Sequence, residues 1–199
     1  MGKSILLCLL LCILSPCMIF AQPAHNVDPA RHPAQNHPPA KKPDIVSFHV
    51  ETEGRGALHI IYSDGSEEEI PRERGRFSDS EGILTQETFS DVRLADDHQN
   101  IGWLADYMIC AQSYPCSAEL VIYRSGSKMK HITPQYGIIW GWKFLKGGKQ
   151  IVVQSGFTHG DETGSYALYD TETVRQLDEF SSKKKKIPNW VQQLQRTER

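Results

Sequence analysis

The chain lacks the short motifs that mark familiar enzyme families. Its 199 residues contain no phosphate-binding loop of the Gly-x-x-x-x-Gly-Lys type, no Gly-x-Ser-x-Gly nucleophile elbow and no His-Glu-x-x-His zinc helix. An excess of one charge is also missing, because 24 acidic residues nearly balance 22 basic ones. The missing motifs argue against a familiar enzyme and leave an unfamiliar one open. The balanced charge gives no reason to expect nucleic acid as a partner.

Cysteine is scarce, and three of the five cysteines lie in the N-terminal apolar run, residues 5–20. This run follows the positive charge of Lys3 and ends at Ala21. The pattern is typical of a secretory signal peptide over residues 1–21. We therefore expect an exported protein, either secreted or periplasmic.

Two alternatives to a cleaved leader stay open. The apolar run approaches the roughly 18 to 20 residues that a membrane-spanning helix needs. The residues before Cys17 also loosely resemble a lipobox, and lipid on this cysteine would anchor the chain to a membrane. Pro16 departs from the lipobox pattern, interrupts the run and is soon followed by a polar, Pro-rich segment, so the signal peptide is favoured.

Two cysteines, Cys110 and Cys116, remain after the leader. An exported chain meets an oxidising compartment, so we expect this pair to form one disulfide around a short loop. A redox or metal role is the alternative. Redox motifs of the Cys-x-x-Cys type have two intervening residues, whereas this pair has five, and a zinc site would need two further ligands.

Residues 22–44 are rich in Pro, His and Ala and carry almost no large apolar side chain. Such a segment buries too little surface to offset its ordering entropy, so we expect a disordered spacer. Its histidines, His25, His32 and His37, are irregularly spaced. We interpret them as polar tail residues, with weak metal binding as the alternative.

Residues 45–182 largely alternate apolar and polar side chains, which predicts an all-β domain. Three strands end at a tyrosine, Tyr62, Tyr123 or Tyr169, and each enters a polar turn before the next strand. Residues 71–90 break this pattern, being polar with scattered apolar side chains. We expect a long surface loop there, with at most a weak strand or a helical turn.

Two units of four predicted strands follow that loop, over residues 91–133 and 138–180, and half a unit precedes it. Sheet units of this size are the sequence signature of β-propeller blades. The segment from Phe144 to Val153 resembles the strand-turn-strand of TolB-like and WD-repeat-like propeller blades, with Gly147 where the blades commonly have Asp. The resemblance covers about half of the chain after the leader and implies antiparallel sheets of propeller-blade type.

About two and a half blades are too few to close a propeller, which needs at least four. An open arc of sheets leaves exposed edges, which proteins cover, shorten or pair with another chain. We therefore expect either an incomplete propeller or a compact sheet stack. The exposed edges predict a protein partner or self-association.

Residues 183–199 differ in character from the β domain. We interpret the run Lys183–Lys186 as a solvated linker, with a patch for anionic membranes as the alternative. Pro188 precedes Trp190, Val191 and Leu194, which would share one face of a helix. This predicts a short amphipathic helix near the C-terminus.

The densest polar cluster contains His159, Asp161 and Glu162. A histidine beside two carboxylates offers a general base or ligands for a divalent metal ion. However, Asp, Glu and Gly are also what an ordinary connection between strands requires. We interpret a second acidic turn, Asp96–His98, as turn chemistry alone.

Aromatic side chains offer a third candidate site. Trp140 and Trp142 would point to one side of a strand, because side chains alternate with a period of two. Packing in the core is favoured over an exposed ligand platform, since aromatic residues bury a large area each. The other aromatic residues that such a platform would use are Trp103, Trp190, Tyr107, Tyr114 and Tyr136.

These observations together predict an exported, non-catalytic β-repeat domain for protein–protein interaction or self-association. We expect no cofactor and no nucleic acid. Two alternatives come from other functional classes. One is a hydrolase or metal-dependent enzyme that uses the 158–163 loop, and the other is a carbohydrate-binding module that uses exposed aromatic residues.

Overall fold

The computed structural model describes residues 43–80, 82–110, 114–157, 164–181 and 186–195, with only the backbone described at Cys110. These residues belong to one compact unit, residues 40–199. Their regular structure is β-sheet apart from a 3-10 turn, η1 (Thr52–Gly54), and one short helix. The predicted all-β class with a short C-terminal helix is therefore confirmed.

The described strands form four antiparallel sheets. The first has the order β1-β2-β3, from β1 (Ile45–Val50), β2 (Leu58–Tyr62) and β3 (Glu67–Ile70). A two-stranded hairpin follows, from β4 (Arg74–Asp79) and β5 (Gly82–Thr85). The next sheet has the order β6-β7-β8-β9, from β6 (Thr88–Leu94), β7 (Asn100–Cys110), β8 (Tyr114–Arg124) and β9 (Lys130–Ile132). The last has the order β10-β11-β12-β13, from β10 (Ile138–Leu145), β11 (Gln150–Gly156), β12 (Ser165–Asp170) and β13 (Gln176–Ser181).

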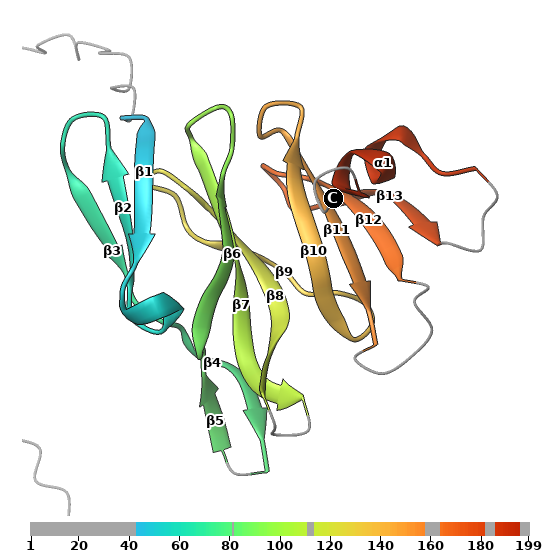
Figure 1. Cartoon of the computed structure of the whole chain (residues 1–199), viewed down its shortest axis with the longest axis horizontal. Helices are drawn as coiled ribbons and strands as arrows, with labels where there is room; N and C mark the ends of the chain where they lie inside the picture. Colours follow the sequence, from blue (N-terminus) through green and yellow to red (C-terminus); the bar gives the residue numbers. More distant parts are fainter. Residues whose placement is uncertain (1–42, 81, 111–113, 158–163, 182–185, 196–199) are drawn as a thin grey trace, which may run out of the picture. The chain divides into compact units, whose positions relative to one another are not determined.

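Two hydrophobic clusters join the three larger sheets into a stack (Figure 1). Ile60 of β2 and Trp103 of β7 belong to the cluster between the first and second of these sheets. Leu104 of β7 and Trp142 of β10 belong to the next cluster. Trp103 and Leu104 are neighbours in sequence, so they point to opposite faces of their sheet, as the two-residue period of a strand requires. The β6–β9 sheet is therefore buried on both faces.

The helix α1 (Asn189–Gln195) covers the outer face of the β10–β13 sheet. Its apolar side chains Val191 and Leu194 are fully buried against Tyr166 and Phe180. Trp190 Nε1 donates a hydrogen bond to Asp178 Oδ2 at 3.2 Å. In the part of the chain that is described, no helix has the length and apolarity to cross a membrane.

Two of the tyrosines that end the predicted strands meet at one carboxylate. Tyr62 and Tyr123 both donate to Oε2 of Glu68, at 2.5 and 2.7 Å. Tyr62 and Glu68 lie in the first sheet, and Tyr123 lies in β8 of the next. This half-buried polar junction fixes the position of the first sheet on the second, in addition to the apolar contacts around it.

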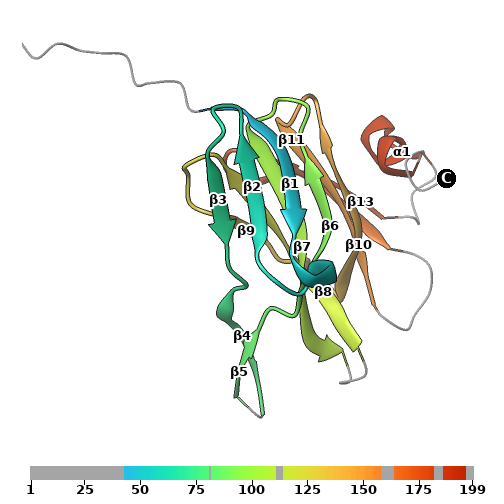
Figure 2. The ribbon, with the colours of Figure 1, turned by 60° about the vertical axis from the view of Figure 1, so that its left-hand side comes forward.

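The structure differs from the expected long loop at residues 71–90. This segment contains the β4–β5 hairpin and the first residues of β6. Its strands alternate poorly because the hairpin is exposed for most of its length, so hydrophobic periodicity gave no signal. Figure 2 shows the hairpin extending from the same end of the sheet stack as the ends of β7 and β8.

The outer face of the β1–β3 sheet lies at one end of the stack, and α1 lies at the other end. Leu58 and Ile60 of β2 point inward and are fully buried, whereas His59 between them points outward. The outward positions on the neighbouring strands are polar and exposed, among them His49 and Glu67. An antiparallel sheet tolerates this arrangement, because one face packs and the other can face solvent.

Candidate functional site

The loop that carries the predicted catalytic or metal-binding residues lies outside the described residues. His159, Asp161 and Glu162 all fall within 158–163. Their assignment therefore stays a prediction. The groove beside β12 and β13 has a volume of about 400 Å³, and Glu179 is the one charged side chain among its described lining residues. The described residues that line this groove thus do not include a pair of charged side chains that could act as general acid and general base.

The second acidic turn has a structural role. His98 Nδ1 lies 2.9 Å from the backbone oxygen of Ile45, and the backbone oxygen of His98 accepts from Ile45 N at 2.7 Å. Asp97 Oδ1 accepts from the backbone N–H groups of Gln99 and Asn100. The turn therefore connects β6 to β7 and holds the first residue of β1.

The aromatic residues do not form a common platform. Trp103 and Trp142 are 1% and 0% exposed and lie in two different clusters. Tyr107 is fully buried as well, while Trp140 and Trp190 are half-buried. Of the aromatic residues considered from the sequence, only Tyr114 and Tyr136 are substantially exposed, at 47% and 55%.

A buried charge network joins the β4–β5 hairpin to the β6–β9 sheet. Its centre is Glu119 of β8, whose side chain is fully buried. Arg76 of β4 donates to both carboxylate oxygens, from Nε to Oε1 at 3.3 Å and from Nη2 to Oε2 at 2.9 Å. His131 of β9 places Nδ1 3.2 Å from Glu119 Oε1, and its Nε2 lies 3.5 Å from Oε1 of Glu73.

The pKa values of the two carboxylates in this network are shifted in opposite directions. Burial acts to raise the pKa of Glu119, but the side chains of His131 and Arg76 outweigh it and hold this pKa below its usual value. Burial raises the pKa of Glu73, with His131 opposing the shift. The partners of Glu119 thus favour its ionised form, whereas burial favours the protonated form of Glu73.

Two hairpins extend past the sheet beside this network, and we call them together the two-hairpin arm. They are the β4–β5 hairpin and the β7–β8 ribbon beyond its pairing with β6, which ends at Asp106 (Figures 1 and 2). The rings of Phe77 and Tyr107 pack edge-to-face between them, with centroids 4.7 Å apart. Farther out, Ile83, Ile109 and Tyr114 are 62%, 41% and 47% exposed.

The predicted disulfide belongs to the β7–β8 ribbon. Cys110 ends β7, and Cys116 lies on β8 with 3% exposure. The side chain of Cys110 lies outside the described residues, so the disulfide stays a prediction. The two strands are paired at this point, with Cys110 opposite Tyr114.

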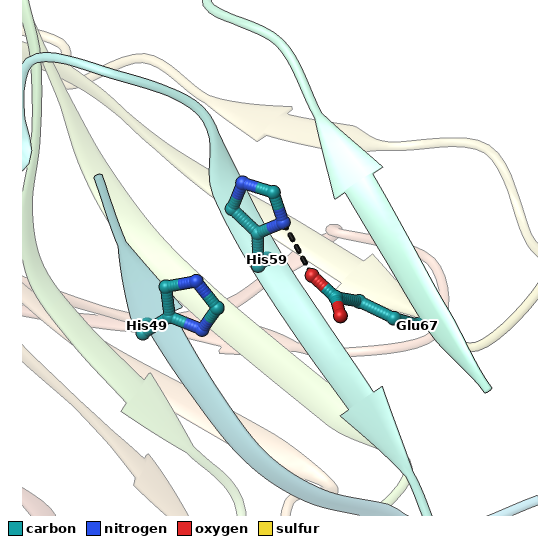
Figure 3. Close-up of side chains that lie close together, drawn as sticks. All are labelled: His49, His59 and Glu67. Atoms are coloured by element: carbon teal, nitrogen blue, oxygen red, sulfur yellow. Dashed lines mark hydrogen bonds and ion pairs between the residues drawn. The ribbon is translucent and has the colours of Figure 1, made fainter. Parts of the chain in front are cut away.

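A cluster of histidine and glutamate side chains lies on the outer face of the β1–β3 sheet. His49 of β1 pairs in register with His59 of β2, and their rings stack with centroids 4.6 Å apart and planes 5° from parallel. His59 Nδ1 lies 2.5 Å from Oε1 of Glu67, at the start of β3 (Figure 3). The other ring nitrogen, Nε2, lies 3.0 Å from Oε1 of Glu51.

Carboxylates on both sides determine the charge of His59. Partial desolvation acts to lower its pKa, but the hydrogen bonds to Glu67 and Glu51 outweigh this effect and raise the pKa. Glu51 has a lowered pKa, first because Oε2 accepts a hydrogen bond from the backbone of Ala57 and then because of His59. The ring is therefore held between two carboxylates, one of which is tied to the backbone.

Neither cluster was predicted from the sequence, although weak signals were present. Glu119 follows Ala118 and precedes three apolar residues, and a charge inside such a run indicates a buried, paired group. His59 interrupts an apolar strand in the same way. The Asp64-Gly65 turn sets the pairing of β2 with β3, and Gly65 has φ of +83° there. The partners of both residues nevertheless depended on contacts that the sequence pattern does not specify.

No protein-family model matches the chain, and no curated protein matches its sequence significantly.

Proposed function

We propose that this chain is an exported, non-catalytic β-domain that binds a partner protein through the two-hairpin arm. The observation that carries this proposal is the contrast between the arm's base and its outer part. The base is held by the two-point ion pair of Arg76 with Glu119. The outer part presents Ile83, Ile109 and Tyr114 to solvent.

The contacts at the base of the arm support a recognition role. A two-stranded hairpin by itself is only marginally stable in water, so it needs further contacts to stay ordered. An arm without a function would not require such contacts. Here Phe77 packs on Tyr107, and Arg76 pairs with a fully buried carboxylate. The predicted disulfide between Cys110 and Cys116 would brace the ribbon further. A preordered arm loses less conformational entropy when it binds.

The chemistry of the arm favours a partner protein with an apolar recess. Three large apolar side chains are a small surface, well below the roughly 1,200 Å² that specific interfaces bury in total. They can act as anchors in a recess, where a few buried aromatic or aliphatic groups contribute most of the binding energy. Among the described strands, none pairs with the ribbon beyond Asp106, so its edges also offer backbone groups for pairing with an added strand. Self-association is the competing outcome.

The two other candidate functions lack a supporting observation. The hydrolase or metal-dependent enzyme rests on His159, Asp161 and Glu162, which lie outside the described residues. The carbohydrate-binding module requires exposed, coplanar aromatic rings, and Trp103 and Trp142 are buried in separate clusters. Both stay alternatives to the binding domain.

Photo-cross-linking in the exporting host tests this proposal. A photoreactive phenylalanine derivative is placed at Ile83 or Tyr114, and at Val46 as the matched control, because Val46 is 50% exposed on β1 away from the arm. We expect a discrete higher-mass adduct from both arm positions and none from Val46. Mass spectrometry then identifies the adduct. Equal cross-linking at all three positions, or none at the arm, contradicts the proposal, and an adduct of two copies replaces the partner protein with self-association.

A further inference from the structure

We propose that His49, His59 and Glu67 form a binding site for a divalent transition-metal ion of the zinc type. Glu51 acts as the carboxylate that orients His59. The site lies on the outer face of the β1–β3 sheet, separate from the two-hairpin arm. It goes beyond the proposed function and does not depend on it.

The donor set selects the class of ion. Two imidazoles and one carboxylate are ligands that Zn²⁺ accepts in sites that keep a fourth position for water. Imidazole also suits Cu²⁺ and Ni²⁺, whereas Ca²⁺ and Mg²⁺ take oxygen ligands almost alone. The site is therefore expected to discriminate strongly against Ca²⁺ and Mg²⁺.

The spacing of the donors suits one shared ion. One donor atom from each of His49, His59 and Glu67 lies within 4.8 Å of the other two. Ligands at about 2.0–2.1 Å from a tetrahedral zinc ion lie about 3.3 Å apart. His59 and Glu67 are closer than this, at 2.5 Å, and would separate by rotation of the exposed Glu67 side chain. The rings of His49 and His59 are 5° from parallel, so their in-plane lone pairs meet at one ion only after the exposed His49 ring also rotates. In Figure 3 the three side chains project from neighbouring strands on the same face of the sheet.

Glu51 supplies the supporting contact that metal-binding histidines ordinarily have. Such a histidine donates its second ring N–H to a carboxylate or carbonyl, which determines the tautomer and the ring orientation. Glu51 Oε1 takes this position at Nε2 of His59, at 3.0 Å. Its Oε2 accepts a hydrogen bond from the backbone of Ala57 at 3.3 Å, so Glu51 itself is restrained. Nδ1 of His59 is left as the nitrogen that faces Glu67.

The buried network around Glu119 has a similar list of donors but a different chemistry. Glu73, Glu119 and His131 also place one donor atom each within 4.8 Å of the others. Arg76, however, donates to both oxygens of Glu119. A fixed guanidinium competes for the same lone pairs and repels a cation, so this network is an ion-pair junction. Among the arginines and lysines that the structure describes, none forms an ion pair or hydrogen bond with His49, His59 or Glu67.

Calorimetric titration with Zn²⁺ tests the site. The protein is purified from its host without a histidine tag, in a background in which His25, His32 and His37 are replaced by alanine. We expect saturable binding of one Zn²⁺ per chain that excess Mg²⁺ does not displace. Titration with Co²⁺ should give the visible absorption of a nitrogen-ligated, four-coordinate ion.

Four variants assign the binding to named side chains. His49→Ala and Glu67→Gln each remove one ligand and should weaken Zn²⁺ binding by about 100-fold or more, while Glu51→Gln should weaken it by about 10- to 100-fold. Glu69→Gln is the matched control, because Glu69 is exposed on the same strand and lies opposite His59 in register. Its affinity should equal that of the parent protein. Circular dichroism checks that each variant is folded.

Two results would overturn the site. One is the absence of saturable Zn²⁺ binding up to millimolar concentration in the folded parent protein. The other is binding that His49→Ala and Glu67→Gln leave unchanged, since the ion would then bind elsewhere. Neither result bears on the cross-linking at Ile83 and Tyr114, so failure of the metal site and failure of the proposed function can be told apart.

Discussion

Arg76 of β4 and Glu119 of β8, which are 43 residues apart in sequence, form a two-point ion pair. Glu119 is fully buried, whereas the Arg76 side chain is 41% exposed. The pair therefore lies at the edge of the core, where the β4–β5 hairpin meets β8. It connects a segment with weak strand signals to the sheet that is buried on both faces, and it makes the hairpin part of the folded unit.

Replacement of Arg76 by alanine is expected to lower the free energy of unfolding by about 2 to 3 kcal/mol. Loss of one partner from a buried pair costs about 3 to 5 kcal/mol, and the partial exposure of Arg76 reduces this value. Urea denaturation followed by circular dichroism measures the change. Arg74→Ala is the matched control, because Arg74 is exposed on the same strand, and its cost should stay within about 0.5 kcal/mol. Equal costs for both variants would contradict the role of the pair.

The pH dependence of stability gives a second test of the same carboxylate. The folded-state pKa of Glu119 is lowered, by His131 and Arg76 against burial, so its stabilising contribution is present above the ordinary carboxyl value of 4.5 and is lost as pH falls through the folded-state pKa. Glu119→Gln should cost about 1 to 2 kcal/mol at pH 7. The difference from the parent protein should shrink below pH 4.5. A difference that stays constant down to the folded-state pKa would show that charge is not the cause.

The neighbouring carboxylate makes the measurement specific. Glu73 has a raised pKa, because burial favours its protonated form, so its contribution to stability has the opposite pH dependence: it is fully present below 4.5 and is lost as pH rises through the folded-state pKa. Glu73→Gln provides the control, since it removes this second titration and leaves the ion pair of Arg76 with Glu119 in place. The acid loss that is due to Glu119 should persist in this variant.

Substitution of Gly102 by alanine tests the contact between the second and third sheets of the stack. A Cβ at this position would lie 2.7 Å from Cη2 of Trp142 and 2.8 Å from Cδ1 of Ile122. Overpacking of this kind costs about 1 to 3 kcal/mol. Trp142→Phe removes the closest atom, so the double variant should cost less than the sum of the two single variants. Additive costs in thermal or urea unfolding would indicate that the sheets are not in contact here.

The predicted disulfide is tested by mass spectrometry of the protein digested without reductant. We expect a cross-linked peptide pair that contains Cys110 and Cys116. Replacement of both cysteines by serine should lower the free energy of unfolding by about 2 kcal/mol, as the chain-entropy model gives for a short loop. Reductant should have the same effect on the parent protein and none on the double variant. Free thiols at both positions in the exported protein would refute the bond.

Strand positions were largely predictable because alternation is a local property. The two four-stranded units expected over residues 91–133 and 138–180 correspond to sheets that run from Thr88 to Ile132 and from Ile138 to Ser181. The apolar residues of these strands have a clear period of two, and the turns between them contain Gly and Asp. The β4–β5 hairpin was missed because its strands are exposed on both faces for most of their length.

The candidate sites were less predictable, because each depends on partners that are distant in sequence. His49, His59 and Glu67 come from three strands, and the register between those strands places them side by side. The charge network around Glu119 depends on Arg76 of β4 and His131 of β9, strands that precede and follow β8 in the sequence. The polar loop that composition indicates as a candidate site, residues 158–163, lies outside the described residues, so that prediction is not tested by the structure.

The sequence by itself determined the class of structure: antiparallel strands, their approximate limits and a short amphipathic helix at the end of the domain. These follow from side-chain periodicity and turn residues, which act within a few neighbours along the chain. Only the tertiary structure decided that Glu119 is a buried anion paired with Arg76 and that two histidines stack beside Glu67. Burial and register arise when sheets pack on one another, and the free energy of a charge depends on what surrounds it in space.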